Sequence, residues 1–180
     1  KPTIWSAIYK KDFIRNHDIR FNETPGASFQ DTAFNFKVWA CADRMQLVPR
    51  AFLHYRQDNE GSSVNSGGKV FCVCDEYAEM ERFLRKHPIY RGKLECVKNR
   101  LKYDTYMWNY ERLSPKFKYV FIERASCEFA EDLKEGNLDV EYFEWYKWDD
   151  LMNLIEDPAL YHTKKALDKE IVYANRGEYE

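Results

Sequence analysis

The sequence predicts an α+β protein that is mostly helical, with a mixed α/β region in residues 1–68 and an all-α region in residues 69–180. Two patterns lead to this fold class. In the first region, short segments of aromatic and β-branched residues alternate with turn-forming segments, which is typical of strands joined by loops. In the second region, apolar residues recur at helical spacing over most of the length. Gly67 and Gly68 mark the change, and we expect a domain boundary there.

Three short strands are expected in the first region, at residues 5–9, 46–48 and 52–56. Each of them is rich in apolar residues, most of them aromatic or branched. A single helical turn is expected after the first strand, at residues 12–16. On the third strand, His54 and Arg56 would share one face because side chains alternate along a strand.

A buried helix is expected at residues 31–43. Ser28 precedes Asp31 by three residues, which resembles the spacing of a capping box at the start of a helix. Apolar side chains then occupy several faces of the helix, as in a helix surrounded by protein. We therefore expect these side chains in the core: Phe34, Phe36, Val38, Trp39, Ala40 and Cys41.

Four helices are expected in the second region, and local signals mark several of their ends. The first ends at His87-Pro88, and the fourth ends before Asp157-Pro158. The third begins at Ser114-Pro115, since serine caps helices and proline suits their first position, and it ends at Gly136. The apolar stripes of the first two helices are Tyr77, Met80, Phe83 and Leu84, and Leu94, Val97, Leu101 and Trp108.

Composition and charge exclude several classes of protein. Apolar residues make up 44% of the chain and aromatic residues 17%, which argues against a disordered protein. The net charge of -2 argues against a nucleic-acid-binding domain, because such domains are usually basic. No apolar run approaches the roughly 18 residues that a membrane-spanning helix needs.

Cysteine usage and the first residues suggest a cytosolic origin and a longer parent protein. The five cysteines are an odd number and lie scattered along the chain, which favours reduced thiols over a disulfide framework. Cys72 and Cys74 lack the spacing of a zinc site and are expected to be buried thiols. The chain opens with Lys1-Pro2 and shows no signal peptide, so we expect a cut inside a longer protein.

Several residues of the first region form an ordered series that bears on function. The series is Trp5, Arg20-Phe21, Phe29-Gln30-Asp31-Thr32, His54-Tyr55-Arg56 and Ser62-Ser63. In this order it resembles the C-terminal portion of a family 2 glycosyltransferase domain with the GT-A fold. The resemblance covers residues 1 to about 66 and implies a bacterial enzyme that builds capsule, cell-wall or lipopolysaccharide glycans.

The resemblance assigns roles to individual residues. Asp31 matches the catalytic base of the family, which takes the proton of the acceptor hydroxyl during an inverting transfer. Gln30 stands where the family commonly has glutamate, so it could bind the acceptor but cannot share charge with Asp31. Further substrate-binding roles fall on four residues of the series: Trp5, Arg56, Ser62 and Ser63.

The resemblance also implies a cofactor and a missing half. Enzymes of this family use Mg²⁺ or Mn²⁺ to stabilise the leaving nucleoside diphosphate, and an Asp-x-Asp motif holds the metal. That motif does not occur in this sequence, so the main ligands are expected upstream, with His54 as a further ligand. Without the upstream half, we expect the chain alone to be inactive as a hexosyltransferase.

The role of Asp31 has two possible interpretations. As part of an enzyme, it would serve a nucleotide-sugar donor and a glycan or lipid-linked acceptor in the cytoplasm, with peripheral membrane association at the inner face as one option. Alternatively, Asp31 is only an acidic residue favoured by the helix dipole at the start of its helix. The chain would then be a non-catalytic helical interaction or acceptor-binding module.

Overall fold

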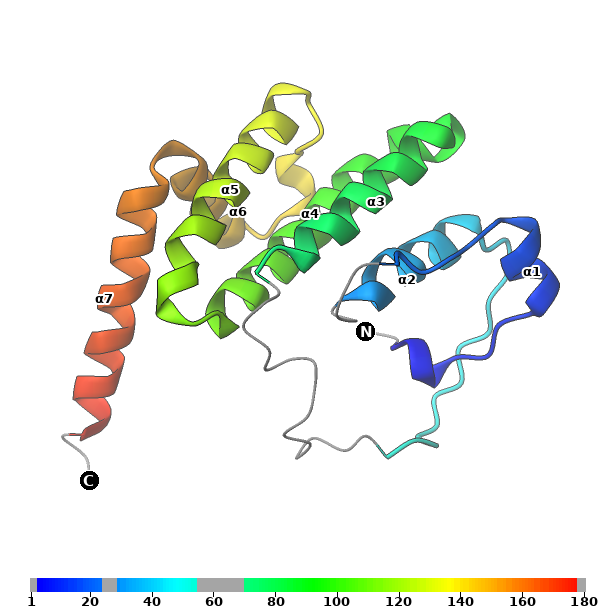
Figure 1. Cartoon of the computed structure of the whole chain (residues 1–180), viewed down its shortest axis with the longest axis horizontal. Helices are drawn as coiled ribbons and strands as arrows, with labels where there is room; N and C mark the ends of the chain where they lie inside the picture. The colour runs from blue at the N-terminus through cyan, green and yellow to red at the C-terminus, as the bar shows by residue number, and fades with distance from the viewer. Residues whose placement is uncertain (1–2, 24–28, 55–69, 178–180) are drawn as a thin grey trace. The chain divides into compact units, whose positions relative to one another are not determined.

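The structure, a computed structural model, describes residues 3–23, 29–54 and 70–177, with side chains as far as Asp168. These residues form helices joined by turns and extended segments, and they contain no strand (Figure 1). In chain order, the helices are η1 (Ile4–Ser6), α1 (Lys11–Asn16), α2 (Gln30–Cys41), α3 (Cys72–Lys86), α4 (Pro88–Arg112), α5 (Pro115–Lys134), η3 (Val140–Tyr142), α6 (Trp145–Glu156) and α7 (Pro158–Gly177).

The chain divides into two compact units, residues 1–94 and residues 95–180. The first unit contains η1, α1, α2 and α3, and the second contains α5, α6 and α7; α4 begins in the first unit and continues into the second. The sequence grouped α3 with the helices that follow it, whereas α3 packs along α2. The expectation that residues 69–180 form a separate domain stays a prediction.

Aromatic side chains build the core of the first unit. Phe21 stacks on Phe34 of α2 with ring centroids 4.3 Å apart, and Tyr9 meets the same ring edge-on at 5.5 Å. Phe36 of α2 contacts Phe83 of α3 edge-on at 6.4 Å. Such pairs stabilise beyond the burial of their area alone, so they hold α2 between the N-terminal segment and α3.

The expected strands are wrong for the residues that the structure describes. Trp5 lies in the short helix η1, and residues 46–48 and 52–54 have no regular secondary structure. Leu47 and Phe52 are about two-thirds exposed. A strand needs a partner for its backbone N–H and C=O groups and a surface for its apolar face, and the described residues offer neither here. The α/β character of the first region is therefore not shown.

The helices of the second unit follow the local signals of the sequence. Ser114 is the N-cap of α5 and Pro115 is its first residue, as predicted. Gly136 follows the end of α5 with φ 74°, the left-handed conformation that favours glycine after a helix. The core of this unit is made of fully buried residues of α5 and α6, namely Phe121, Ile122, Ala125, Phe129, Leu151 and Leu154. Helix α7 was not predicted, although Asp157 Oδ1 caps it by accepting the N–H of Leu160 at 2.9 Å.

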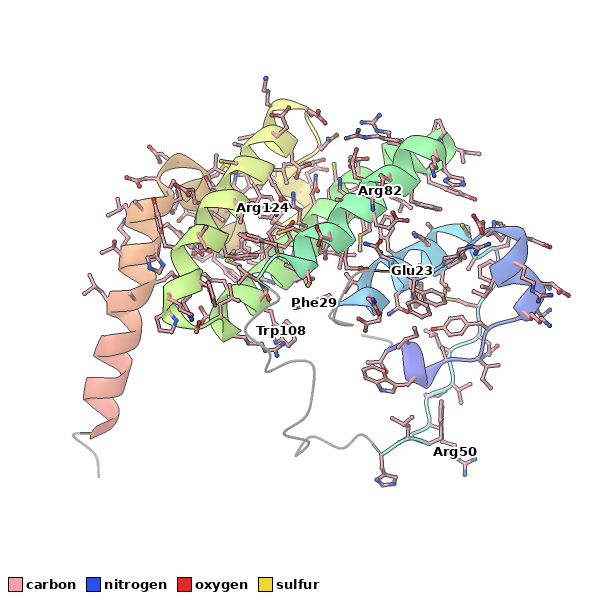
Figure 2. All side chains as sticks on the ribbon, viewed as in Figure 1. Glu23, Phe29, Arg50, Arg82, Trp108 and Arg124 are labelled. Atoms are coloured by element: carbon pink, nitrogen blue, oxygen red, sulfur yellow. The ribbon has the colours of Figure 1, made fainter. Side chains whose placement is uncertain are left out.

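Helix α4 forms as predicted, but the predicted buried face is wrong. Leu101 is 39% exposed and Trp108 is 50% exposed, and Figure 2 labels Trp108 on this helix. The buried face instead carries Glu95, Lys98, Asn99, Lys102, Tyr103, Tyr106, Asn109 and Tyr110. Polar partners on α5 make this possible, because Lys102 binds Asp132 at 2.9 Å and Tyr106 donates to Glu128 at 2.5 Å.

Exposed side chains correct two further expectations. Trp39 is 44% exposed rather than part of the core, because it lies on the outer side of α2. Cys74 is buried as expected, whereas Cys72 is only half-buried. Among the described residues, no helix is both long enough and apolar enough to cross a membrane.

Candidate functional site

Asp31 lies in the first turn of α2 and is half-exposed. Phe29 occupies the N-cap position with φ 64°, and its side chain cannot cap the helix (Figure 2). The carbonyl of Phe29 accepts the N–H of Thr32 at 2.8 Å, which tightens the first turn. Ser28, which was expected to begin a capping box with Asp31, lies outside the described residues. The start of α2 therefore lacks a side-chain hydrogen bond from its own cap residue.

A glutamate from α3 satisfies the start of α2. Glu76 is fully buried, and its Oε2 accepts a hydrogen bond from the backbone N–H of Ala33 at 3.2 Å. Ala33 comes two residues after Asp31, so Glu76 contacts the same helical turn that carries the candidate base. The carboxyl group thus takes the place of a local N-cap and brings an acid to the positive end of the helix dipole.

A second pair joins the same helices one turn further along. Lys37 of α2 is buried, forms a short ion pair with Glu79 of α3, and donates to the carbonyl of Arg20 at 3.3 Å. Arg82 reaches the other oxygen of Glu79 at 2.8 Å. Because two charged contacts bridge the helices, α2 is held against sliding along α3.

The electrostatics of Glu76 differ from those of an ordinary surface glutamate. The pKa of Glu76 is raised to about 7, mainly by burial and to a smaller extent by the nearby charge of Asp31. The N–H of Ala33, the side chain of Asn22 and the ammonium of Lys37 act in the opposite direction. A carboxyl group with this pKa exchanges its proton near neutral pH, as general acids and bases in active sites do.

The structure places some of the predicted site residues and leaves others undescribed. Asp31 lies in the first turn of α2, as expected, and Gln30 is the first residue of the helix, one position before the predicted start. Trp5 is 44% exposed in η1, and His54 is exposed in the extended segment that follows α2. The remaining predicted substrate-binding residues, Arg56, Ser62 and Ser63, lie outside the described residues.

The described part of the chain does not by itself build a metal site. Within it, no three His, Cys, Asp or Glu side chains are grouped closely enough to hold an ion. Asp31 and Glu76 form an acidic pair, but Glu76 already accepts from a backbone N–H and is enclosed by protein. A role for His54 in binding metal stays a prediction.

Glu76 and Lys37 were not predicted as site residues, although the helical pattern contains a signal for both. Glu76 lies three residues after Val73 and four before Met80, inside the buried stripe of α3. Lys37 lies four residues after Ala33 on the buried side of α2. A charged residue within an otherwise apolar helical stripe must find a partner, since an unpaired buried charge is very costly. Its position predicts such a partner, but it does not say which residue provides it.

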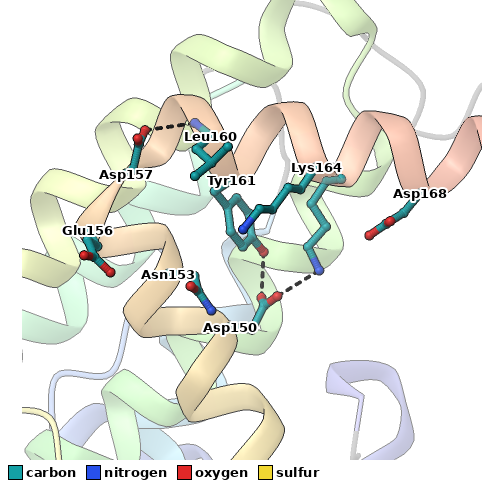
Figure 3. Close-up of a pocket in the computed structure, with 9 residues that line it drawn as sticks. Asp150, Asn153, Glu156, Asp157, Leu160, Tyr161, Lys164 and Asp168 are labelled. Atoms are coloured by element: carbon teal, nitrogen blue, oxygen red, sulfur yellow. Dashed lines mark hydrogen bonds and ion pairs between the residues drawn. The ribbon is translucent and has the colours of Figure 1, made fainter.

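A polar cluster in the second unit centres on Asp150 of α6 (Figure 3). The hydroxyls of Tyr103 and Tyr161 both donate to its Oδ2 at 2.6 Å, and Lys165 binds its Oδ1 at 2.9 Å. Burial opposes ionisation of Asp150, but these three donors lower its pKa. Burial and the Asp150 charge raise the pKa of both tyrosines, so the cluster does not exchange protons near neutral pH.

This cluster borders a shallow pocket whose other lining residues are Asn153, Glu156, Asp157, Leu160, Lys164 and Asp168 (Figure 3). Its lining mixes acidic and basic side chains, and three of the lining residues, Asp150, Tyr161 and Lys165, already bind one another. The Asp150 cluster therefore fits a structural connection between α4, α6 and α7 better than a reactive site. The start of α2 remains the candidate functional site.

Comparisons with known proteins do not identify the chain: no family model, curated protein or solved structure gives a significant match. Its function is therefore inferred from its own residues. At the start of α2, a half-exposed carboxylate is carried on a turn that a buried carboxyl group of the neighbouring helix holds in place. This arrangement suits the removal of a proton from a hydroxyl group that approaches from solvent.

Proposed function

We propose that this chain is the C-terminal, acceptor-side portion of a bacterial inverting glycosyltransferase of family 2. The enzyme transfers a sugar from a nucleotide-sugar donor to a glycan or lipid-linked acceptor in the synthesis of cell-envelope or capsular polysaccharide. The observation that supports this most directly is the position of Asp31, half-exposed in the first turn of an anchored helix. The ordered motifs of the first region resemble those of sugar-transferring enzymes, and they are the reason to assign sugar transfer to a base at that position.

In the proposed reaction, Asp31 acts as general base. An acceptor hydroxyl attacks the anomeric carbon of the donor sugar, and the carboxylate of Asp31 takes the hydroxyl proton as the new C–O bond forms. The bond between the anomeric carbon and the phosphate oxygen breaks, and the nucleoside diphosphate leaves with the electron pair. A single displacement of this kind inverts the configuration at the anomeric carbon.

The other residues of the series would bind the substrates. Gln30, next to Asp31, can hydrogen-bond an acceptor hydroxyl, and Trp5 offers an aromatic face to a sugar ring. Arg56 with Ser62 and Ser63 would hold the diphosphate. Mg²⁺ or Mn²⁺ would be bound mainly by residues upstream of this chain, and the enzyme would work in the cytoplasm or at the inner face of the membrane.

The test is Asp31→Asn in the full-length enzyme. A positioned base contributes roughly 10²–10⁴-fold to the rate, so we expect a loss of kcat of that order with donor affinity nearly unchanged. The matched control is Asp12→Asn, which alters an exposed aspartate in the first turn of α1. Turnover near the wild-type value in Asp31→Asn, with the variant folded by circular dichroism, would exclude Asp31 as the base.

The competing function is a non-catalytic interaction module, and exposed aromatic residues of the second unit favour it. Trp145 is 80% exposed and Tyr146 is 53% exposed at the start of α6. Exposed aromatic side chains are enriched at protein interfaces. If the upstream part of the gene lacks nucleotide-binding strands and an Asp-x-Asp motif, the module is the better description. If both are present, the enzyme is favoured, and this chain alone should turn over no nucleotide sugar in the presence of Mn²⁺.

A further inference from the structure

In the first turn of helix α2, one backbone N–H group is satisfied by another helix. A helix leaves its first N–H groups without partners inside the helix, and a polar side chain at the N-cap usually accepts one of them. Phe29 cannot do so, and its carbonyl binds Thr32 at 2.8 Å. Glu76 of α3 accepts the N–H of Ala33 instead, across 43 residues of sequence. The geometry of the turn that carries Asp31 therefore depends in part on tertiary structure.

Stability alone does not explain a glutamate at this place. Glu76 is 0% exposed, and its Oε1 has no hydrogen-bond partner among the residues that the structure describes. A buried, incompletely satisfied carboxyl group costs more than the methionine or leucine that would fit the same apolar stripe. Buried polar groups of this kind are often kept for a functional reason. The unpartnered oxygen lies in the same carboxyl group that holds the turn of Asp31.

We propose that Glu76 is a positioning residue for Asp31: it fixes the first turn of α2 through Ala33 and thereby sets where the Asp31 carboxylate meets the acceptor hydroxyl. The proposal deepens the proposed function and rests on it for the role of Asp31. Glu76 itself does not touch the substrate, because it is enclosed by protein. The residue acts through the backbone of α2 and through its charge beside Asp31.

The groups around Glu76 determine whether its carboxyl group is charged. From α2, Asp31 disfavours a charge on Glu76 and Lys37 favours one, and from the N-terminal segment the side chain of Asn22 also favours one. On α3 itself, Glu79 is already paired with Lys37 and Arg82. A glutamine at position 76 would keep an oxygen acceptor for Ala33 but would remove the charge. An alanine would remove both.

The first experiment needs no activity and uses the whole chain. In Glu76→Ala we expect hydrogen exchange of the Ala33 amide, measured by NMR, to quicken about tenfold, as expected for the loss of one hydrogen bond. Glu76→Gln should restore the slow exchange, and the control Asp75→Ala should leave it unchanged because Asp75 is exposed on α3. In addition, Asp31→Asn should lower the titration midpoint of the Glu76 carboxyl carbon. Two results would overturn the proposal. One is an equal rate of hydrogen exchange at the Ala33 amide in wild type and Glu76→Ala, and the other is a titration midpoint of Glu76 that does not change in Asp31→Asn.

The second experiment uses the full-length enzyme. Glu76→Ala should lower kcat about tenfold or more with little change in the KM of the donor, and Glu76→Gln should restore most of kcat. A residue needed only for folding would instead lower the amount of active enzyme and leave kcat per active site unchanged. If Asp31→Asn remains active, the proposed function fails. Hydrogen exchange of the Ala33 amide and titration of Glu76 would still test the contact between Glu76 and the first turn of α2. If Asp31→Asn is inactive but Glu76→Ala keeps wild-type kcat, the positioning role is wrong and the proposed function stands.

Discussion

Glu76→Gln should abolish a pH dependence of stability that the wild-type chain shows between pH 4.5 and about pH 7. Burial, followed by the charge of Asp31, raises the pKa of Glu76 from 4.5 to about 7 in the folded protein. The folded state therefore binds a proton in this pH range that the unfolded state has released. By linkage, the stability contributed by this protonation is fully present below pH 4.5 and is lost as the pH rises through about 7.

The size of the effect follows from the displacement of the pKa. Each unit corresponds to about 1.4 kcal/mol, so the free energy of unfolding should fall by about 3 kcal/mol over this range because of Glu76. Glu76 is 0% exposed, so screening by solvent reduces this value little. Glutamine does not titrate, and the stability difference between wild type and Glu76→Gln should shrink by about the same amount as the pH rises.

Urea denaturation of the chain at intervals from pH 4.5 to pH 8, followed by circular dichroism at 222 nm, measures this difference. Glu79→Gln is the control. Burial opposes ionisation of Glu79, but Lys37 and Arg82 lower its pKa below the ordinary 4.5, so the stability that this ionisation contributes is lost only at lower pH. The difference between wild type and Glu79→Gln should therefore stay nearly constant over most of the range from pH 4.5 to pH 8. A difference between wild type and Glu76→Gln that stays constant to within about 1 kcal/mol would refute the reasoning, since extrapolation errors are of that size.

Thermal or urea denaturation of further variants tests the packing of the second unit. Phe121→Ala should destabilise the chain by about 3–5 kcal/mol because this ring of α5 is fully buried, whereas Trp145→Ala should change stability by less than about 0.5 kcal/mol because Trp145 is 80% exposed. Gly136→Ala should cost about 1 kcal/mol through its φ of 74° alone, since an added Cβ would meet no atom within 4 Å. Asp150→Asn should cost about 2 kcal/mol at neutral pH, and the penalty should disappear as the pH falls, since the lowered pKa of Asp150 contributes stability only where the residue is ionised. Equal effects of Phe121→Ala and Trp145→Ala, or an Asp150→Asn penalty independent of pH, would contradict these expectations.

Local signals predicted most helices and their ends. His87 follows the last residue of α3, and Ser114-Pro115 begins α5. These signals act within a few residues of the chain, since proline lacks the N–H and the backbone freedom that continuing a helix requires. Asp157-Pro158 is such a signal for the start of α7, because Asp157 accepts the N–H of Leu160. It was interpreted only as the end of α6.

Predictions that depended on a distant partner were less successful. Residues 46–48 have the composition of a strand, but a strand exists only beside another strand, and the described residues do not provide one. The apolar stripe through Leu101 and Trp108 was expected to face the core, whereas the opposite, polar face of α4 is buried. Partners such as Asp132 and Glu128 on α5 made that burial possible, and their proximity cannot be read from spacing along α4.

The sequence by itself determined that the chain is mostly helical, where several helices begin and end, and that Asp31 lies at the start of a helix. Only the tertiary structure decided which helix faces are buried and that Glu76, 43 residues from Ala33, holds the turn next to Asp31. The physical reason is the range of the forces involved. Most helix ends and turns are set by neighbours in the chain, whereas the burial of a charge, and the bond that Glu76 gives to α2, depend on a partner that folding brings close.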